Sequence, residues 1–385
     1  MKILIYTEFF FPIPGGVQTI VSELARGLTE YGADHLPEES FEVTVATRTP
    51  RSNSNEDSWP FRLVRRPSPW RLLQLVRAAD VVHIAGPALL PMMISLLLRK
   101  PFVVEHHGFQ TACPNGLMFF EPNQQPCPGH FMAKQYMKCF ECNREIVGKT
   151  KSAYWLTLTP IRRWLSNRAR HNIVPTNWLG SVLKMQRTTT VYHGVPAPRA
   201  TNSESVSNPV IAFQGRMVTT KGANHLIAAA HLVRRERSDF ELKLIGDGPQ
   251  LHNLRTMSAD LGSQVEFLGH VPDDDLDKVL SPAVAVVMPS LGGEVFGLVA
   301  AENMMRGKLL IVSDIGALKE LVGEAGLVFP AGSVEALAAC IRSTLENPAG
   351  AAALGMAARR RALRMFDRQS MIQAHISCYQ EKPRH

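Results

Sequence analysis

Short apolar segments alternate with helical stretches along almost all of the 385 residues of the chain. This alternation constrains the fold, because strands separated by helices form parallel sheets with right-handed crossovers. Strands are predicted near residues 2–6, 42–46, 80–84, 102–105, 172–175 and 189–192, and near 210–214, 241–245, 265–268, 284–288, 309–313 and 326–329. Helices are predicted between them, for example at 17–31 and 160–169. The pattern therefore predicts an α/β protein with doubly wound parallel sheets.

A segment rich in proline and serine divides this pattern into two halves. Residues 196–208 have the composition of a linker and show no apolar period. We therefore expect one domain at residues 1–195 and a second at residues 209–366. A chain of this length with 45% hydrophobic residues can bury two complete cores.

In the second half, a glycine-containing loop separates a predicted strand from a predicted helix. Residues 284–290 form an apolar run typical of a buried strand, residues 291–293 form the loop, and a helix is predicted over 296–305. The first turn of a helix has unpaired backbone N–H groups, which bind phosphate well beside a glycine that allows close approach. The predicted donors are the N–H groups of Phe296, Gly297 and Leu298.

Two carboxylates eight positions apart, Glu294 and Glu302, bracket the start of this helix. Carboxylates accept hydrogen bonds from hydroxyl groups, so the segment offers donors to a phosphate and acceptors to a sugar. This combination suits a nucleotide sugar. The alternative is a capped amphipathic helix with two incidental glutamates, because a single motif often occurs by chance.

A second motif follows the predicted strand at 210–214. Gly215-Arg216 comes directly after the strand, and Lys221-Gly222 precedes a predicted helix. Open α/β sheets bind ligands at the carboxyl ends of their strands, where these two cations would lie. A diphosphate leaving group needs such cations when no metal ion supplies the charge. A solvated basic turn is the alternative for this motif taken alone.

Together the two motifs resemble the donor site of the family 4 glycosyltransferases, which are retaining enzymes of the GT-B fold. The resemblance extends over essentially the whole chain and is strongest in residues 209–330. The further segments that resemble this family are Lys2–Tyr6 with Pro14–Val17, Val103–Gly108, Val191–Val195, Leu244–Pro249, Val265–Gly269 and Asp314–Glu320. His193 stands where the family usually has asparagine, and we interpret it as a tolerated change in the crossover between the domains.

The resemblance implies two Rossmann-like domains that face a central cleft. The first would bind the acceptor, the second would bind the nucleotide sugar, and a helix at about 367–381 would return to the first. The implied reaction transfers a hexosyl group, with retained anomeric configuration, from a nucleoside diphosphate sugar to a hydroxyl of a saccharide or lipid-linked saccharide. Synthesis of a cell-envelope polysaccharide is the favoured setting. A UDP-sugar is the favoured donor, a GDP-sugar is the second choice, and no cofactor is required for catalysis.

The same resemblance implies the residues of the site. His107 would orient the acceptor hydroxyl, whereas His106 would point to the other side of the strand and into the core. A hydrogen-bonded histidine at the end of a strand is the alternative for His107. The implied catalytic residues are His107, Arg216, Lys221 and Glu294. The implied donor-binding residues are Gly15, Gly16, Gly215, Arg216, Lys221, Gly246, Glu294, Phe296, Gly297, Leu298 and Glu302.

Four of the six cysteines lie close together in the sequence, namely Cys113, Cys127, Cys139 and Cys142. The two-residue spacing of Cys139 and Cys142 lets both sulfurs reach one ion, and the other two lie in a stretch rich in proline and glycine. We predict a structural zinc site with these four thiolates. Reduced thiols are the main alternative, and disulfides are disfavoured in a reducing cytoplasm. Cys340 and Cys378 are interpreted as core residues.

The formal net charge of +8 arises in the first half of the chain. Residues 1–195 hold 22 basic and 14 acidic residues, whereas residues 196–385 hold 20 of each. The basic residues are scattered without an aromatic-interleaved motif, so nucleic-acid binding is not predicted. Attraction to an anionic membrane or a lipid-phosphate acceptor explains the excess, and indifferent surface charge is the alternative. No signal peptide or bilayer span is recognisable, which predicts a cytoplasmic protein, at most peripheral on the inner face of the membrane.

Other functions of a doubly wound chain fit this sequence less well. A nicotinamide dehydrogenase needs Gly-x-Gly-x-x-Gly after a strand, and Gly246-Asp-Gly248 lacks the third glycine. A binding or scaffold protein would lack some of the charged residues of the donor motifs, which are all present. A sugar-nucleotide epimerase or a pyridoxal-phosphate phosphorylase of the same fold remains an alternative. Glycosylation of a soluble sugar or small natural product is also an alternative.

Overall fold

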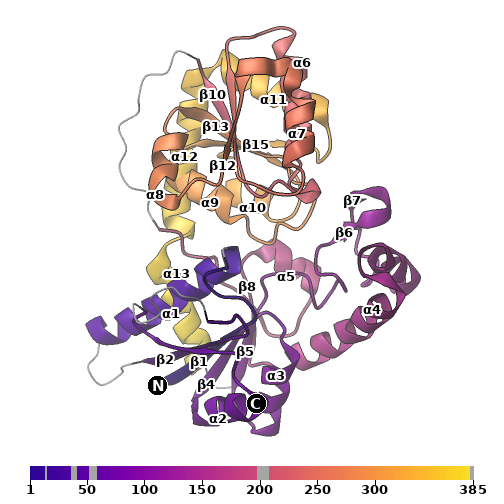
Figure 1. The fold of residues 1–385 in the computed structure, drawn as a ribbon. Helices are drawn as coiled ribbons and strands as arrows, with labels where there is room; N and C mark the ends of the chain where they lie inside the picture. Colours follow the sequence, from indigo (N-terminus) through magenta and orange to yellow (C-terminus); the bar gives the residue numbers. More distant parts are fainter. Residues whose placement is uncertain (14, 36–40, 52–58, 197–207, 382–385) are drawn as a thin grey trace. The chain divides into compact units, whose positions relative to one another are not determined.

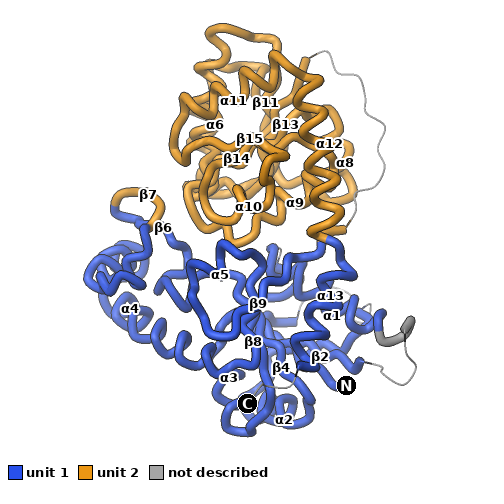
Figure 2. The backbone as a smooth tube through the Cα atoms, turned by 180° about the vertical axis from the view of Figure 1, so that it is seen from behind, with its two compact units in different colours: residues 1–122, 128–194, 367–385 blue, residues 123–127, 195–366 orange. Residues whose placement is uncertain are grey.

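The computed structural model of the chain describes residues 1–13, 15–35, 41–51, 59–196 and 208–381. They form two compact units, each built around its own parallel sheet (Figures 1 and 2). The first unit contains residues 1–122, 128–194 and 367–385, and the second contains residues 123–127 and 195–366. The predicted linker lies outside the described residues, apart from its two end residues. The predicted fold class, with two doubly wound parallel sheets, is confirmed.

The first unit contains a seven-stranded sheet with the order β3-β2-β1-β4-β5-β8-β9, in which every neighbouring pair is parallel. Its strands are β1 (Lys2–Thr7), β2 (Glu42–Thr47), β3 (Arg62–Arg65), β4 (Val81–Ala85), β5 (Phe102–Glu105), β8 (His171–Val174) and β9 (Thr188–Thr190). The apolar pattern misses β3, because its two arginines enclose only two apolar residues. Strand β3 lies at the edge of the sheet, and none of its residues is fully buried.

The helices of the first unit are α1 (Gly16–His35), α2 (Pro69–Ala78), α3 (Leu89–Leu97), α4 (Tyr136–Ser166), α5 (Asn177–Leu183) and α13 (Arg368–Gln380). Between β5 and α4 lie the short elements β6 (Phe119–Phe120), η2 (Glu121–Asn123) and β7 (Gln125–Pro126). Helix α4 begins far ahead of the predicted 160–169. Gly148 interrupts it with φ at +79°, so two helical stretches with different apolar phases join there and weaken the sequence signal.

Helix α13 comes from the C-terminal part of the chain and completes the core of the first unit. Met371 and Ile372 pack in the same apolar cluster as Val21 and Leu24 of α1. The two helices approach so closely that a Cβ atom at Gly27 would overlap Ile372 Cδ1. Figure 1 shows the yellow helix α13 beside the indigo helix α1.

The second unit contains a six-stranded parallel sheet with the order β12-β11-β10-β13-β14-β15. Its strands are β10 (Val210–Gln214), β11 (Glu241–Ile245), β12 (Val265–Gly269), β13 (Ala283–Met288), β14 (Leu309–Ser313) and β15 (Leu327–Phe329). Its helices are η3 (Thr219–Lys221), α6 (Ala223–Arg234), α7 (Leu251–Met257), η4 (Ala259–Gln264), α8 (Asp273–Leu280), α9 (Leu298–Met305), α10 (Leu318–Val322), α11 (Val334–Glu346) and α12 (Pro348–Met365). Every strand predicted for this half is present.

Each sheet has a topological switch point, where the order in which successive strands are placed across the sheet reverses its direction. In the second unit the chain runs outward from β10 to β11 and β12, and then returns to the other side of β10 as β13. In the first unit it runs from β1 to β2 and β3 and returns beside β1 as β4. The loops at the carboxyl ends of the two central strands diverge at such a point and leave a crevice where ligands bind. No helix among the described residues is both long and apolar enough to cross a bilayer.

Candidate functional site

A buried carboxylate and a lysine meet where β10 and β13 end. Lys221 Nζ forms an ion pair with Glu294 Oε1, and Ser290 Oγ donates a hydrogen bond of 2.8 Å to the same oxygen. Glu294 is 5% exposed, whereas the Lys221 side chain is 31% exposed. Neither contact uses Oε2 of Glu294. The pair therefore combines a half-exposed cation with a fixed carboxylate that keeps one oxygen for a ligand.

The two loops that carry this pair are locked together through their backbones. Gly222 has φ at +69°, and a Cβ atom there would overlap the carbonyl oxygen of Pro289. The Leu291 N–H donates to the Thr220 carbonyl at 2.8 Å. Only glycine fits both the left-handed conformation and the close approach. The Lys221-Gly222 motif thus positions its lysine by fixing the backbone beside it.

Arg216 lies on the same loop, directly after β10, and its guanidinium is exposed. Its side chain forms no hydrogen bond or ion pair with the residues that the structure describes. The backbone around it is held at the sheet edge, because the Gly215 N–H donates to Ile245 and the Met217 N–H donates to Asp247. A Cβ atom at Gly246 would overlap the carbonyl oxygen of Gly215, so Gly246 allows this close backbone approach. The predicted contact of both glycines with a donor stays a prediction.

The start of helix α9 differs from the prediction. The helix begins at Leu298 and not at Phe296, because Gly297 has φ at +91° and caps it in the left-handed conformation. The N–H groups without intrahelical partners therefore begin at Leu298, while the Ala301 N–H already bonds to the Gly297 carbonyl at 3.1 Å. The Phe296 side chain is buried against Phe366, with ring centroids 5.4 Å apart.

Glu302 lies in the second turn of α9 and is partly buried. Burial raises the pKa of its carboxyl to about 7, although Arg306 opposes the shift, and Asp273 on the neighbouring helix adds to it. Arg306 itself binds Asp277 through an ion pair of 2.7 Å. Glu302 therefore changes its charge close to neutral pH.

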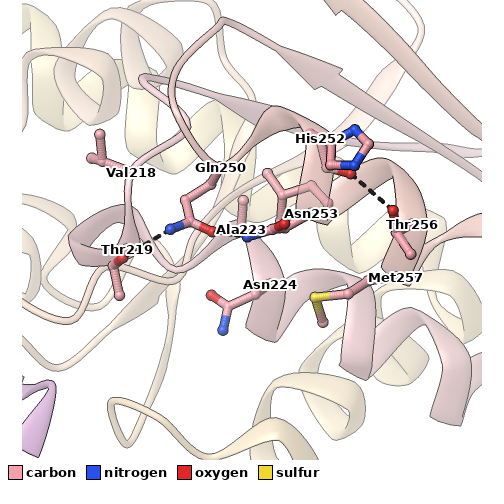
Figure 3. Close-up of a pocket in the computed structure, with 10 residues that line it drawn as sticks. Val218, Thr219, Ala223, Asn224, Gln250, His252, Asn253, Thr256 and Met257 are labelled. Carbon is pink, nitrogen blue, oxygen red and sulfur yellow. Dashed lines mark hydrogen bonds between the residues drawn. The ribbon is translucent and has the colours of Figure 1, made fainter.

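A cavity of about 620 Å³ opens beside the loop that carries Lys221, between the start of α6 and α7 (Figure 3). Gln250 donates to Thr219 Oγ1 at 3.4 Å across it, and the Thr256 hydroxyl donates to the His252 carbonyl at 3.2 Å. Its lining contains no lysine or arginine. A diphosphate needs cations, so the switch point with Lys221 and Arg216 is the better candidate despite the size of this cavity.

In the first unit, His107 lines a cavity of about 100 Å³ at the switch point between β1 and β4. The lining residues are Thr7, Glu8, Phe9, Val17, Ala85, Gly86, Pro87, Ala88, His107, Gln110 and Arg162. Gly15 directly precedes α1 and Gly16 begins it, next to the lining residue Val17, whereas Pro14 lies outside the described residues. His106 is fully buried, bonds Asn172 at 2.8 Å, and has its pKa lowered by burial to about 4.

A fully buried glutamate, Glu105, lies beneath His107 and is surrounded by histidines. Its carboxylate oxygens lie 3.0 Å from His83 Nε2, 3.4 Å from His107 Nε2, and 3.6 Å from both His193 Nδ1 and His375 Nε2. Burial would raise the pKa of Glu105, but His107 and His375 hold it well below its usual range. His193 is therefore a buried member of this cluster, and its interpretation as a tolerated change stays a prediction.

The cysteines predicted to bind zinc lie in both units. Cys113, Cys139 and Cys142 are buried in the first unit, and Cys127 belongs to the short segment grouped with the second. Asn115 joins two of them, because Cys113 Sγ donates to its Oδ1 at 3.0 Å and its Nδ2 donates to Cys142 Sγ at 3.7 Å. The zinc site stays a prediction.

Two family models match the chain. Residues 14–199 match the model for Glycosyltransferase Family 4, and residues 197–361 match the model for Glycosyl transferases group 1. The two matches together extend over both compact units.

Curated relatives are similar to part of the chain. Glycogen synthase of Mycobacterium tuberculosis is 33% identical over 198 residues, which cover 50% of this chain and 48% of the relative. The 2-deoxystreptamine glucosyltransferase of Streptomyces kanamyceticus is 31% identical over 145 residues, 37% of each chain. A GDP-mannose-dependent monoacylated phosphatidylinositol monomannoside mannosyltransferase of Corynebacterium glutamicum is 30% identical over 185 residues, 46% of this chain and 49% of the relative. The chain spans about half the length, or less, of these relatives.

Solved structures share the fold of the whole chain. Sucrose-phosphate synthase of Thermosynechococcus elongatus superimposes with a TM-score of 0.72 at 20% identity, covering 98% of both chains. HepE of Anabaena, solved in complex with UDP-glucose, also gives a TM-score of 0.72, at 19% identity over 97% of both chains.

Proposed function

The chain belongs to the family 4 glycosyltransferases, and we propose that it transfers a hexosyl group from a nucleoside diphosphate sugar to a hydroxyl, with retained configuration. The observation that supports this most strongly is the Lys221–Glu294 pair at the switch point of the second sheet. Its cation and carboxylate match the two halves of such a donor, the diphosphate and the sugar.

In the proposed reaction, the bond from the anomeric carbon to the diphosphate breaks and negative charge grows on the leaving phosphate. Lys221, the exposed Arg216 and the first N–H groups of α9 stabilise that charge. Glu294 accepts a hydrogen bond from a sugar hydroxyl through Oε2, while Lys221 and Ser290 hold Oε1. Glu302 accepts hydrogen bonds from the ribose hydroxyls, and this role requires the ionised carboxylate.

The acceptor hydroxyl would be oriented by His107 in the cavity of the first unit. Attack on the same face as the departing phosphate retains the configuration, and the phosphate takes up the proton that the hydroxyl loses. Glu294 is engaged with Lys221 and therefore binds the sugar instead of serving as a nucleophile.

We favour a UDP-sugar as donor because the similar HepE structure contains UDP-glucose. A GDP-sugar is the second choice, since the Corynebacterium glutamicum relative is dependent on GDP-mannose. A saccharide or lipid-linked saccharide is the proposed acceptor class. Most of the exposed large apolar side chains lie in the first unit, including Trp70, Leu97, Met137 and Trp164. Together with the positive charge of this half, they favour peripheral contact with an anionic membrane.

A screen of nucleoside diphosphates and their sugars tests the proposal. We expect one of them to raise the apparent Tm of the wild type, and the matching sugar donor to be slowly hydrolysed. Lys221→Ala and Glu302→Ala should weaken both effects, whereas Lys278→Ala, an exposed lysine on α8, should not. A wild type that no nucleoside diphosphate protects would contradict the proposal.

We also propose the structural zinc site at Cys113, Cys127, Cys139 and Cys142. The burial of three of these cysteines and the contact of two of them with Asn115 support it. Zinc would tie the segment between β5 and α4 together, because this segment contains little regular structure of its own. Element analysis should find zinc with sulfur ligands that Cys139→Ser removes and Cys340→Ser retains.

A further inference from the structure

Three members of the cluster around Glu105 come from parts of the first unit that are far apart in sequence. His83 comes from β4, Glu105 from the end of β5, and His375 from α13. All three side chains are fully buried, and their ligand atoms lie within 4.8 Å of one another. A cluster with this composition can be a network of hydrogen bonds, or it can be the ligand set of a cation.

Hydrogen bonding inside the cluster is incomplete. His83 Nε2, His375 Nε2 and both oxygens of Glu105 are buried without a hydrogen-bond partner among the described residues. The contact of 3.0 Å between His83 and Glu105 lacks the alignment of a hydrogen bond, and His375 Nε2 lies 3.6 Å from the carboxylate. Buried polar atoms nearly always have partners, so these four atoms, with His107 Nε2 at 3.4 Å from the same carboxylate, indicate a further bound group.

The opposite nitrogen of each imidazole is anchored. His375 Nδ1 lies 2.8 Å from the Met371 carbonyl, which can only accept, so this nitrogen carries the proton and a neutral ring has its lone pair on Nε2. His83 Nδ1 lies 2.9 Å from the Tyr379 hydroxyl, which can accept its proton in the same way. Metal-binding histidines usually have such an outer partner, which fixes the tautomer and turns the free nitrogen toward the ion.

The spacing of the cluster also fits a metal ion. Zinc binds nitrogen and oxygen ligands at about 2.0–2.2 Å, so tetrahedral ligands lie roughly 3.3–3.6 Å from one another. His83 Nε2 lies 3.0 Å from Oε2 of Glu105 and His375 Nε2 lies 3.6 Å from Oε1, so each imidazole faces a different oxygen of the carboxylate, and the three ligand atoms lie within 4.8 Å of one another. Two imidazoles and one carboxylate are also a ligand set that zinc accepts.

We propose that His83, Glu105 and His375 bind a divalent transition-metal ion, with zinc as the first candidate. The ion would fasten α13 to β4 and β5 and supply the positive charge that a buried carboxylate requires. It would have a structural role, because all three ligands are closed off from solvent. The site is separate from the four cysteines and does not depend on the proposed glycosyl transfer.

X-ray absorption at the zinc edge of the wild-type protein tests the proposal without a variant. Protein produced with added Zn²⁺ should show nitrogen and oxygen neighbours at about 2.0–2.1 Å, in addition to any sulfur neighbours at about 2.3 Å from the cysteines. Sulfur neighbours alone, or no zinc at all, would overturn the proposal.

Metal content assigns the site to these residues. In a Cys139→Ser, Cys142→Ser background, one equivalent of zinc should persist, and His375→Gln should remove it. His252→Gln, at an exposed histidine on α7, is the matched control and should keep it. Cobalt in the same cysteine variant should give visible ligand-field bands without a thiolate charge-transfer band. If the cysteine variant binds neither zinc nor cobalt, the proposal is wrong. If His375→Gln does not fold, the cobalt spectrum of the cysteine variant still shows whether nitrogen and oxygen ligands bind the metal.

Discussion

The raised pKa of Glu302 predicts that donor binding strengthens as pH increases through neutrality. With a pKa of about 7, Glu302 is about one tenth ionised at pH 6 and about nine tenths ionised at pH 8. The proposed contact with the ribose hydroxyls requires the carboxylate. The Kd for UDP should therefore fall up to about tenfold between these two pH values, which corresponds to about 1.4 kcal/mol.

The same shift predicts an opposite effect on the stability of the free protein. The folded pKa of Glu302 is above its ordinary value, so its contribution to stability is complete below that value, at acidic pH, and is lost as pH rises through about 7. The loss is at most about 3 kcal/mol, and the partial exposure of the side chain reduces it. UDP should therefore protect the protein more at the higher pH, where it binds more tightly and the contribution of Glu302 to the stability of the free protein is lost.

Isothermal titration of UDP at pH 6, 7 and 8, on the wild type and on Glu302→Gln, measures the effect. The phosphate groups of the nucleotide also titrate in this range, but their contribution is common to both proteins and cancels in the ratio of the two Kd values. At pH 7 the wild type should release about half a proton more than the variant, seen as a dependence of the binding heat on the buffer. Equal pH dependence in the two proteins would refute the reasoning.

Three further predictions follow from other features. Lys221→Met should lower kcat for sugar transfer about 10²–10³-fold, because it removes a cation from the leaving group, and a loss below tenfold in initial-rate assays would contradict this role. Gly222→Ala should lower the apparent Tm by about 5–10 °C, because the backbone of Gly222 is left-handed and a Cβ atom there would overlap the Pro289 carbonyl oxygen. Gly262 is also left-handed but has free space around the Cβ position, so Gly262→Ala should lower the apparent Tm by only about 2–4 °C. Sedimentation with anionic vesicles should decrease as salt rises, while neutral vesicles should bind little; equal binding to both would exclude the proposed electrostatic contact.

The fold could be read from the sequence where strands are almost continuously apolar, as in β10, β13 and β14 of the second unit. The pattern fails at β3, whose two apolar residues are too few to stand out, and at the first part of α4, where a break changes the apolar phase. The start of α9 was misplaced, because the sequence shows a glycine at position 297 but not its left-handed backbone conformation.

The candidate site was predictable only where its residues are close in sequence. Lys221 and Glu294 were found because each belongs to a short motif with its own glycine. The cluster around Glu105 was missed as a cluster, because its members come from four separate segments, although His107 and His193 were each singled out for other reasons. Only the tertiary structure shows that their polar atoms face one another.

The contribution of α13 to the first unit determines the order in which the protein can mature during translation. The second unit is almost continuous in sequence, so its core can form as soon as residue 366 has left the ribosome. The first unit must wait for Met371 and Ile372, although most of its residues are synthesised much earlier. Until then the apolar surface of α1 that they cover lacks the residues that bury it in the complete fold.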